Sequence, residues 1–387
     1  MKILKTLLVP KEMLLTHRFI PLTRFINFRL YGKKSIKSNK MSDILSENPP
    51  RKPCHQDVFR YIYPFAHINV RSDVKVRVLG APADKYPEPN VLNAMLIGGH
   101  VRNCPVTMHV DVSEDEKLVN IALKKISDSA DFYCDLEVPM RCDLHIDAKD
   151  SVTVRNICSS EITVRAQKNI KTKDLQADNV TLASNSGDIT CESLLRGRLT
   201  IVETNALGNI SLDKLLGINL NCKTEAGNIS TNSCYVEESK FVTLTGSLQL
   251  KNVHKKIEVD VQRNGELTMT GVNGNLTVRT NGGKLSLQIS ELTGNSVINA
   301  KEVEQALINI SEQIEEQSNI EVTSRAVVLD DSLSHLQSCI TDDNTIFLLK
   351  PENTSSNLIV NSNGKVQLGK LSWIGSVYAQ LNKSDTK

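Results

Sequence analysis

Aromatic residues are scarce in this chain. Only 4% of its 387 residues are Phe, Tyr or Trp, and half of these rings lie before residue 70. Long apolar runs are missing as well, because no stretch approaches the ~18 uninterrupted apolar residues of a membrane-spanning helix. The sequence therefore predicts no membrane span. A body so poor in rings also lacks the aromatic platforms that sugar-binding clefts usually use.

Sequence motifs of metal and catalytic sites are missing too. The nine cysteines form no Cys-x-x-Cys pair and no zinc-ligand spacing, so no metal site is predicted. The chain has no Gly-rich phosphate loop and no Gly-x-Ser-x-Gly elbow, and we predict no cofactor and no catalytic residue. The carboxylate pairs Asp330–Asp331 and Asp342–Asp343 are interpreted as solvated loop acids.

The basic charge is concentrated at the N-terminus. Residues 1–40 carry ten Lys/Arg and one acid, whereas the rest of the chain carries 36 basic and 43 acidic residues. This composition is typical of a mitochondrial presequence, and Arg29 and Tyr31 fit a processing pattern with cleavage after Tyr31. We predict import into mitochondria, with the matrix as the expected compartment. Translation from Met41 would instead give a cytosolic protein.

The same charge distribution indicates which parts of the chain could bind nucleic acid. Because the positive charge lies in the leader and the rest of the chain is net acidic, we predict a body that does not bind nucleic acid. The alternative interpretation of the leader is a basic arm that binds nucleic acid or acidic lipid.

One apolar pattern recurs from about residue 150. It reads apolar-x-apolar-x-x-apolar, then a second apolar-x-apolar pair, and it repeats every 18 to 21 residues. Such alternation predicts short strands with one buried face. The opening triplets are Val152/Val154/Ile157, Ile170/Thr172/Leu175, Ile189/Cys191/Leu194, Ile210/Leu212/Leu215, Ile229/Thr231/Cys234, Leu248/Leu250/Val253 and Leu267/Met269/Val272, and Leu285/Leu287 open an eighth copy. The second pairs include Ile162/Val164, Val180/Leu182, Leu199/Ile201, Ile218/Leu220, Ile257/Val259 and Leu276/Val278.

A period near 19 residues, holding two strands and two turns, predicts one coil of a parallel β-solenoid. The predicted fold class is therefore all-β, with coils stacked about 4.8 Å apart. A β-sandwich would show shorter spacing without the same residue types at equivalent positions, and a propeller blade needs about 40 residues. A glycine precedes most triplets by two residues, and we expect it to lie in a turn with positive φ: Gly187, Gly208, Gly227, Gly246, Gly265 and Gly283.

The alternation also assigns faces. Leu212, Thr231, Leu250, Met269 and Leu287 are expected to stack in one inward row. Cys191 and Cys234 fall on inward positions and are interpreted as buried small hydrophobic residues. The outward neighbours form a polar line, here called the outer polar row, which we predict to be an interaction face: Thr190, Ser211, Ser230, Gln249, Thr268 and Ser286.

Composition divides the chain into five parts. We expect a targeting leader over 1–40, a linker over 41–57, an N-terminal β region with first coils and a cap over 58–149, the regular solenoid over 150–300, and degenerate coils with a cap over 301–387. Aromatic alternation over 59–65 suggests a strand or an anchoring segment. Residues 301–316 could form a helix, capped by Asn299 and Glu302, or a strand over Leu307–Ile310, which is the favoured interpretation.

The phrases Glu137-Val138-Pro139 and Gly208-Asn209-Ile210-Ser211-Leu212 carry a family resemblance. At these residues the sequence resembles the putative-adhesin β-solenoid domains of bacteria, over about residues 130–372. The leader and layout are similar to eukaryotic proteins called family with sequence similarity 185. The resemblance implies the solenoid fold and transfers no catalytic residue.

Two functional hypotheses follow from these features. The first is a non-enzymatic scaffold, imported into mitochondria, that offers a long rigid face to a protein partner, because solenoids bind through extended surfaces. The alternative is a carbohydrate-active β-helix enzyme in a secretory compartment, which would need converging carboxylates. Neither the identity of the partner nor the oligomeric state follows from the sequence.

Overall fold

The structure of this protein is a computed structural model. It describes residues 53–371, except 83, 87, 89, 102, 128–130, 335–337, 341–344 and 352–353. The leader, the linker as far as residue 52, and the processing residues Arg29 and Tyr31 therefore lie outside the described residues. Asp342 and Asp343 lie outside them as well.

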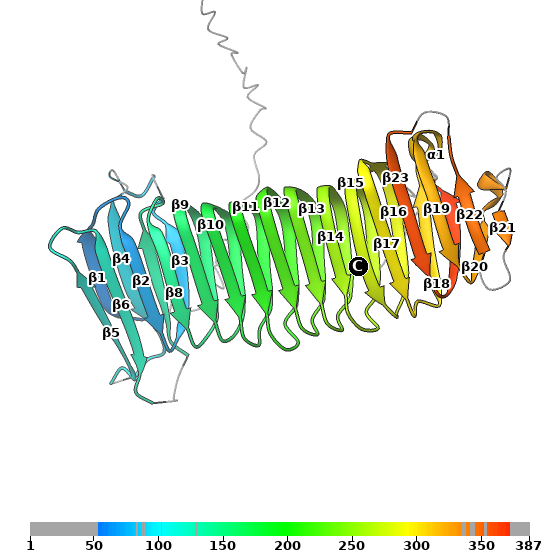
Figure 1. Ribbon diagram of the computed structural model, residues 1–387. Coiled ribbons are helices and arrows are strands. Elements are labelled where there is room, and N and C mark those ends of the chain that lie inside the picture. The colour runs from blue at the N-terminus through cyan, green and yellow to red at the C-terminus, as the bar shows by residue number, and fades with distance from the viewer. Residues whose placement is uncertain are drawn as a thin grey trace, which may run out of the picture. The chain divides into compact units, whose positions relative to one another are not determined.

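Long parallel strands form the central part of the fold (Figure 1). Each strand pairs in parallel with the next one along the chain, and each supplies most of one coil. The predicted parallel β-solenoid is confirmed, and it is an all-β fold. The strands are β9 Val152–Ala166, β10 Ile170–Ser184, β11 Ile189–Thr204, β12 Ile210–Thr224, β13 Ile229–Thr243, β14 Leu248–Val261 and β15 Leu267–Asn281.

The coils bend where the backbone enters the left-handed region. Several strands have a positive φ immediately after their first straight segment, at residues that are mostly Asn, Asp or Gly. These residue types tolerate that conformation better than branched ones do, so they allow the bend without breaking the ladder of hydrogen bonds. The positions are Asn156, Asp174, Ser193, Asn252 and Gly271.

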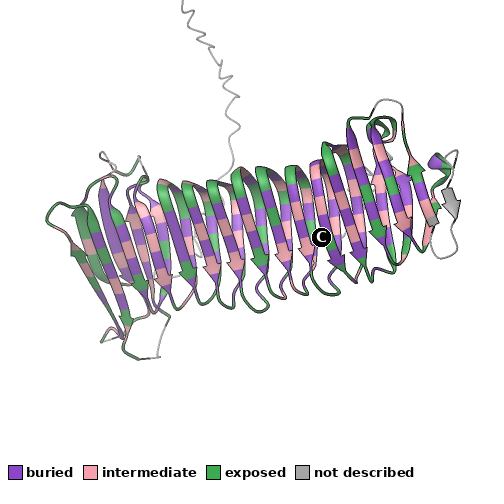
Figure 2. Cartoon of the chain, viewed as in Figure 1, coloured by how far each residue is buried: buried purple, intermediate pink, exposed green. Residues whose placement is uncertain are grey.

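Aliphatic rows fill the interior. Leu212, Thr231, Leu250, Met269 and Leu287 are register partners on successive strands, and all five are buried. The inward row that the alternation predicts is therefore confirmed. Figure 2 shows the same alternation as bands of buried and exposed residues that cross the strands.

The predicted register is wrong in two coils. In β11 Leu194 is half-buried and Leu195 points inward instead, because the first bend of β11 holds one residue more than that of β10 or β12. Leu199 and Ile218 are predicted to point inward, but they lie just before the second inward-facing segment of their strands. Their exposed fractions are 42% and 44%. Ile201 is also only half-buried, and its coil buries other residues on the second segment, namely Thr200 and Val202.

The turn glycines serve a different purpose from the predicted one. Of the six, only Gly283 has a positive φ, so the expectation is wrong for the other five. Close stacking explains these residues: a Cβ on Gly227 would lie 1.8 Å from the carbonyl oxygen of Gly208, and one on Gly246 only 1.7 Å from that of Gly227. The glycines allow successive turns to approach each other.

Polar side chains join the same turns. Asn169 Oδ1 accepts a hydrogen bond from the Asp188 backbone N–H (2.9 Å), and Asp188 Oδ1 accepts one from Asn209 (2.8 Å). The pattern continues through Asn209 Oδ1 to Asn228 N (2.9 Å) and through Asn228 Oδ1 to Ser247 N (2.8 Å). This ladder stabilises each turn on the previous one, because it satisfies backbone donors that no strand pairs.

At the N-terminal end the strands do not stack in chain order. One stack runs β1–β4–β7–β3–β9, and a second runs β5–β6–β2–β8–β9. The outermost pairs of both stacks, β1–β4 and β5–β6, are antiparallel. The strands are β1 Cys54–Tyr61, β2 His67–Ser72, β3 Lys75–Gly80, β4 Val91–Ile97, β5 Val106–Val112, β6 Leu118–Lys125, β7 Tyr133–Val138 and β8 Asp143–Ala148.

The C-terminal end is also interleaved. Strand β23 lies between β17 and β19, and β24 lies between β18 and β20, so the last strands of the described chain are internal. The elements are β16 Leu285–Leu292, β17 Gly294–Lys301, β18 Gln305–Ile310, α1 Glu312–Gln317, β19 Ser318–Ser324, β20 Ala326–Leu329, a 3-10 turn at Asp331–Leu333, β21 Ser338–Ile340, β22 Thr345–Leu349, β23 Ser356–Ser362 and β24 Lys365–Lys370.

Residues 301–316 contain both of the structures considered for them. The favoured strand over Leu307–Ile310 is confirmed within β18, and the short helix α1 follows it. The cap of α1 is Ser311, whose hydroxyl accepts a hydrogen bond from Ile314 N at 3.3 Å. The predicted capping pair, Asn299 and Glu302, is wrong because the helix begins twelve residues later than that pair requires.

Candidate interaction face

The outer polar row is one continuous line in the structure. Its six residues are register partners on strands β11 to β16, one residue to each strand. All of them are exposed or half-exposed, because their neighbours on each side point into the core. With strands about 4.8 Å apart, the row is about 24 Å long. Its role in binding stays a prediction.

Most of the row has unused hydrogen-bonding capacity. The Ser230 hydroxyl lies 3.5 Å from the Ile210 carbonyl oxygen. Among the described residues, the other five side chains have no hydrogen-bond partner, which leaves their hydroxyl and amide groups to the solvent. A partner could therefore bind these groups without first breaking contacts within the protein.

The line of register partners extends beyond the six predicted residues. On the N-terminal side it continues through Lys171, Thr153, Arg77, Asp135 and Met95. On the C-terminal side it continues through Leu307, Gln367 and Val328. The sequence could not reveal these additions, because most of them lie on strands that stack out of chain order.

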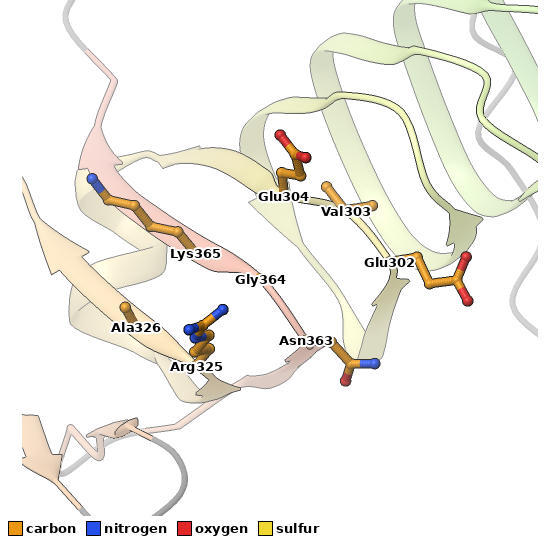
Figure 3. Close-up of a pocket in the computed structure, with 8 residues that line it drawn as sticks. All are labelled: Glu302, Val303, Glu304, Arg325, Ala326, Asn363, Gly364 and Lys365. Atoms are coloured by element: carbon orange, nitrogen blue, oxygen red, sulfur yellow. The ribbon is translucent and has the colours of Figure 1, made fainter.

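A shallow hollow lies at the C-terminal turns (Figure 3). Its volume is about 590 Å³, and its charged lining residues are Glu302, Glu304, Arg325 and Lys365. The ends of these side chains point in different directions and do not meet at a common point. Two turns stack at this hollow, and Lys365 N donates a hydrogen bond to Glu304 O (2.8 Å) between them.

Asp330 has a structural contact of its own. It precedes the 3-10 turn at Asp331–Leu333, and its Oδ1 accepts a hydrogen bond from Asp331 N at 2.8 Å. The side chain therefore caps this turn, and both Asp330 and Asp331 are exposed. The interpretation of this pair as solvated loop acids is confirmed.

The repeat cysteines are buried, as predicted. Burial raises the pKa of Cys191 to about 12 and that of Cys234 to about 12. Both are therefore thiols at neutral pH, and thiols are poor nucleophiles and poor metal ligands. In the part of the chain that the structure describes, no group of three His, Cys, Asp or Glu residues could hold a metal ion. No described helix is long and apolar enough to cross a membrane.

Three exposed apolar side chains went unrecognised in the sequence. Leu199, Ile218 and Tyr235 lie on coils β11 to β13, and the Tyr235 ring stacks on His254 with centroids 4.5 Å apart. The apolar alternation is misleading at two of them, because Leu199 and Ile218 each stand two residues from another aliphatic residue and so imitate an inward pair.

No protein-family model matches the sequence. Among solved structures, the chain is similar to a "putative adhesin" from Parabacteroides distasonis at 9% identity, with 81% of this chain and 96% of that chain covered and a TM-score of 0.35. It is also similar to a "putative adhesin" from Parabacteroides merdae at 8% identity, with 82% and 96% covered and a TM-score of 0.33. The family named from the sequence therefore stays a resemblance.

Proposed function

We propose that this protein is a non-enzymatic scaffold that is imported into mitochondria and binds a partner protein along the outer polar row. One observation carries the proposal: six polar side chains on six successive strands form a straight line and mostly lack partners among the described residues. Many weak hydrogen bonds along such a line would give shape-based recognition, with a few anchors setting the affinity.

The state of the carboxylates supports a role other than catalysis. The hydrogen bond from Lys149 lowers the pKa of Asp73, and the hydrogen bond from Lys240 lowers the pKa of Glu258. Both groups stay ionised at neutral pH within ion pairs. A general acid or base would instead need a pKa moved toward neutrality, so we assign these two carboxylates to holding coils together.

Changing the row should weaken the partner without unfolding the protein. Thr190→Arg combined with Ser230→Arg puts two large cations on the row while the inward positions stay as they are. We expect proximity labelling with this double variant to recover several-fold less of the proteins that it recovers with the natural chain. Thr181→Arg combined with Asn221→Arg is the matched control. These half-exposed residues lie beyond the bend, in the second half of β10 and of β12, whereas the outer polar row lies before the bend of its strands. Equal recovery from both double variants would refute the assignment of the face.

Import should depend on the leader. Residues 1–40 carry a net charge of +9, and the inward-negative potential of the inner membrane draws such a segment across. A fluorescent reporter fused to residues 1–40 should therefore accumulate in mitochondria, and a chain that begins at Met41 should stay in the cytosol. A mitochondrial location for the shortened chain, or a cytosolic one for the reporter, would contradict this prediction.

A further inference from the structure

The extended row enters a hollow at its N-terminal end. This hollow has a volume of about 420 Å³ and is lined by residues of β3, β4, β7, β9 and β10. Four of its lining residues, Met95, Asp135, Arg77 and Thr153, are register partners in one line, and Lys171 joins that line to Thr190. The hollow is thus continuous with the outer polar row.

Its floor and its rim differ in chemistry. Leu79 and Met95 are half-buried and supply apolar surface. Lys75, Arg155 and Lys171 are exposed and supply positive charge at the rim. An apolar floor with a few charged groups around it is the usual composition of a binding site.

The acidic residues that line the hollow already accept hydrogen bonds from cations within the protein. Both carboxylate oxygens of Asp135 accept hydrogen bonds from the Arg77 guanidinium, which also lies over the Tyr133 ring at 4.1 Å. Glu137 accepts hydrogen bonds from Lys85 at 2.6 and 2.7 Å, and others from Tyr86 and Asn93. These carboxylates therefore contribute little negative potential toward a ligand.

Two cations of the hollow form no hydrogen bond and no ion pair among the described residues: Lys75 and Arg155. Lys171 forms an ion pair with Glu192 at 2.5 Å, and Arg155 lies close enough to help lower the pKa of the same carboxyl. This single carboxylate is shared among several cations and leaves the region with an excess of positive charge. Lys173 lies beside Arg155 in the register of β9 and β10 and adds a further positive charge. The hollow is thus a positive region on a chain that is net acidic after residue 40.

We propose that this hollow binds an extended acidic segment of the partner protein, with one apolar side chain of that segment on Leu79 and Met95. The inference rests on the proposed function, and it names the chemistry of the partner segment that binds in the hollow. The hollow spans five stacked strands, or about 19 Å, which an extended segment of about six residues would cover. Arg77 covers a face of the Tyr133 ring, so that face cannot serve as a stacking platform for a nucleic-acid base.

A labelled peptide tests the proposal directly. The probe is a fluorescein-labelled Glu-Glu-Leu-Glu-Glu-Leu-Glu-Glu peptide, and the full chain is titrated into it while anisotropy is measured. We expect binding that weakens as salt is added and that disappears when every Glu of the peptide is replaced by Gln. Lys75→Glu combined with Arg155→Glu should weaken binding at least about tenfold.

The control pair has the same change of charge on another face. Arg71→Glu combined with Arg165→Glu should leave the affinity within about twofold. Arg155 and Arg165 both lie on β9 and both are exposed, and the basic leader is present in every variant. Its contribution therefore cancels in the comparison. Thermal melting of each variant shows that the chain stays folded.

Three results would overturn the inference: no binding of the acidic peptide, an equal loss of affinity in both charge-reversed pairs, or tighter binding of a single-stranded oligonucleotide of the same charge. The proposed function fails separately. The peptide could fail to bind while the Thr190 and Ser230 double variant still loses the cellular partner. That result would support the proposed scaffold function and exclude only the binding of an acidic segment in the hollow.

Discussion

Leu250→Asp is expected to unfold the solenoid under conditions in which Gln249→Asp leaves it folded. Leu250 is fully buried between Thr231 and Met269, its register partners on the two adjacent strands. An aspartate there would place an unpaired charge among aliphatic side chains, at a cost of about 4 kcal/mol. Gln249 points to the solvent on the same strand, so its replacement should cost less than about 1 kcal/mol.

Urea or thermal denaturation of the two variants measures this difference. The pair is well matched, because the two residues are neighbours in β14 and receive the same charged side chain. Similar losses of stability would mean that the strand has no distinct inner and outer face, which would contradict the register of the whole stack.

Gly246→Ala is expected to be almost as harmful, although alanine adds only one methyl group. That methyl carbon would lie 1.7 Å from the Gly227 carbonyl oxygen and 2.8 Å from Thr243 Oγ1. An ordinary contact needs more than 3.4 Å, so the two turns would have to separate. Because several ladder hydrogen bonds would lengthen together, we expect a loss of about 3 kcal/mol.

Gly99→Ala is the control for that substitution. A Cβ at Gly99 would meet no atom within 4 Å, and its φ is not in the left-handed region. The change should therefore be neutral or slightly stabilising, within about 1 kcal/mol, because alanine restricts the unfolded chain. Hydrogen exchange should locate the damage of Gly246→Ala at β13 and β14. A melting temperature equal to that of the natural chain would show that the turns are not closely stacked.

The repeat made most of the central fold predictable. Residues such as Leu212 and Leu250 recur with the same spacing, and alternation alone assigns them to the interior. Leu194 and Leu199 are misplaced because β11 holds one residue more than β10 in its first bend, and one extra residue reverses the side chains that follow it. Ile218 is misplaced for another reason: it stands two residues before Leu220 and imitates an inward pair, whereas the register places Leu220 and Cys222 inside.

The candidate site was only half predictable, for a topological reason. The outer polar row lies on consecutive coils, so its members follow from the period. The hollow brings Lys75, Met95, Asp135 and Arg155 together from strands that stack out of order. No periodicity relates these four residues, and only the three-dimensional pairing reveals that they share a surface.

The interleaved ends have a consequence for the order of folding. Strands β23 and β24 occupy internal positions, yet they are the last described strands to be synthesised. Strand β19 reaches β17 only through β23, so the C-terminal coils cannot close until about residue 370 has left the ribosome. Strands β10 to β14, which pair only with the strands before and after them in the chain, can form progressively before that time. Completion of this end is therefore a late step that requires long-range contacts, and contacts of this kind form slowly.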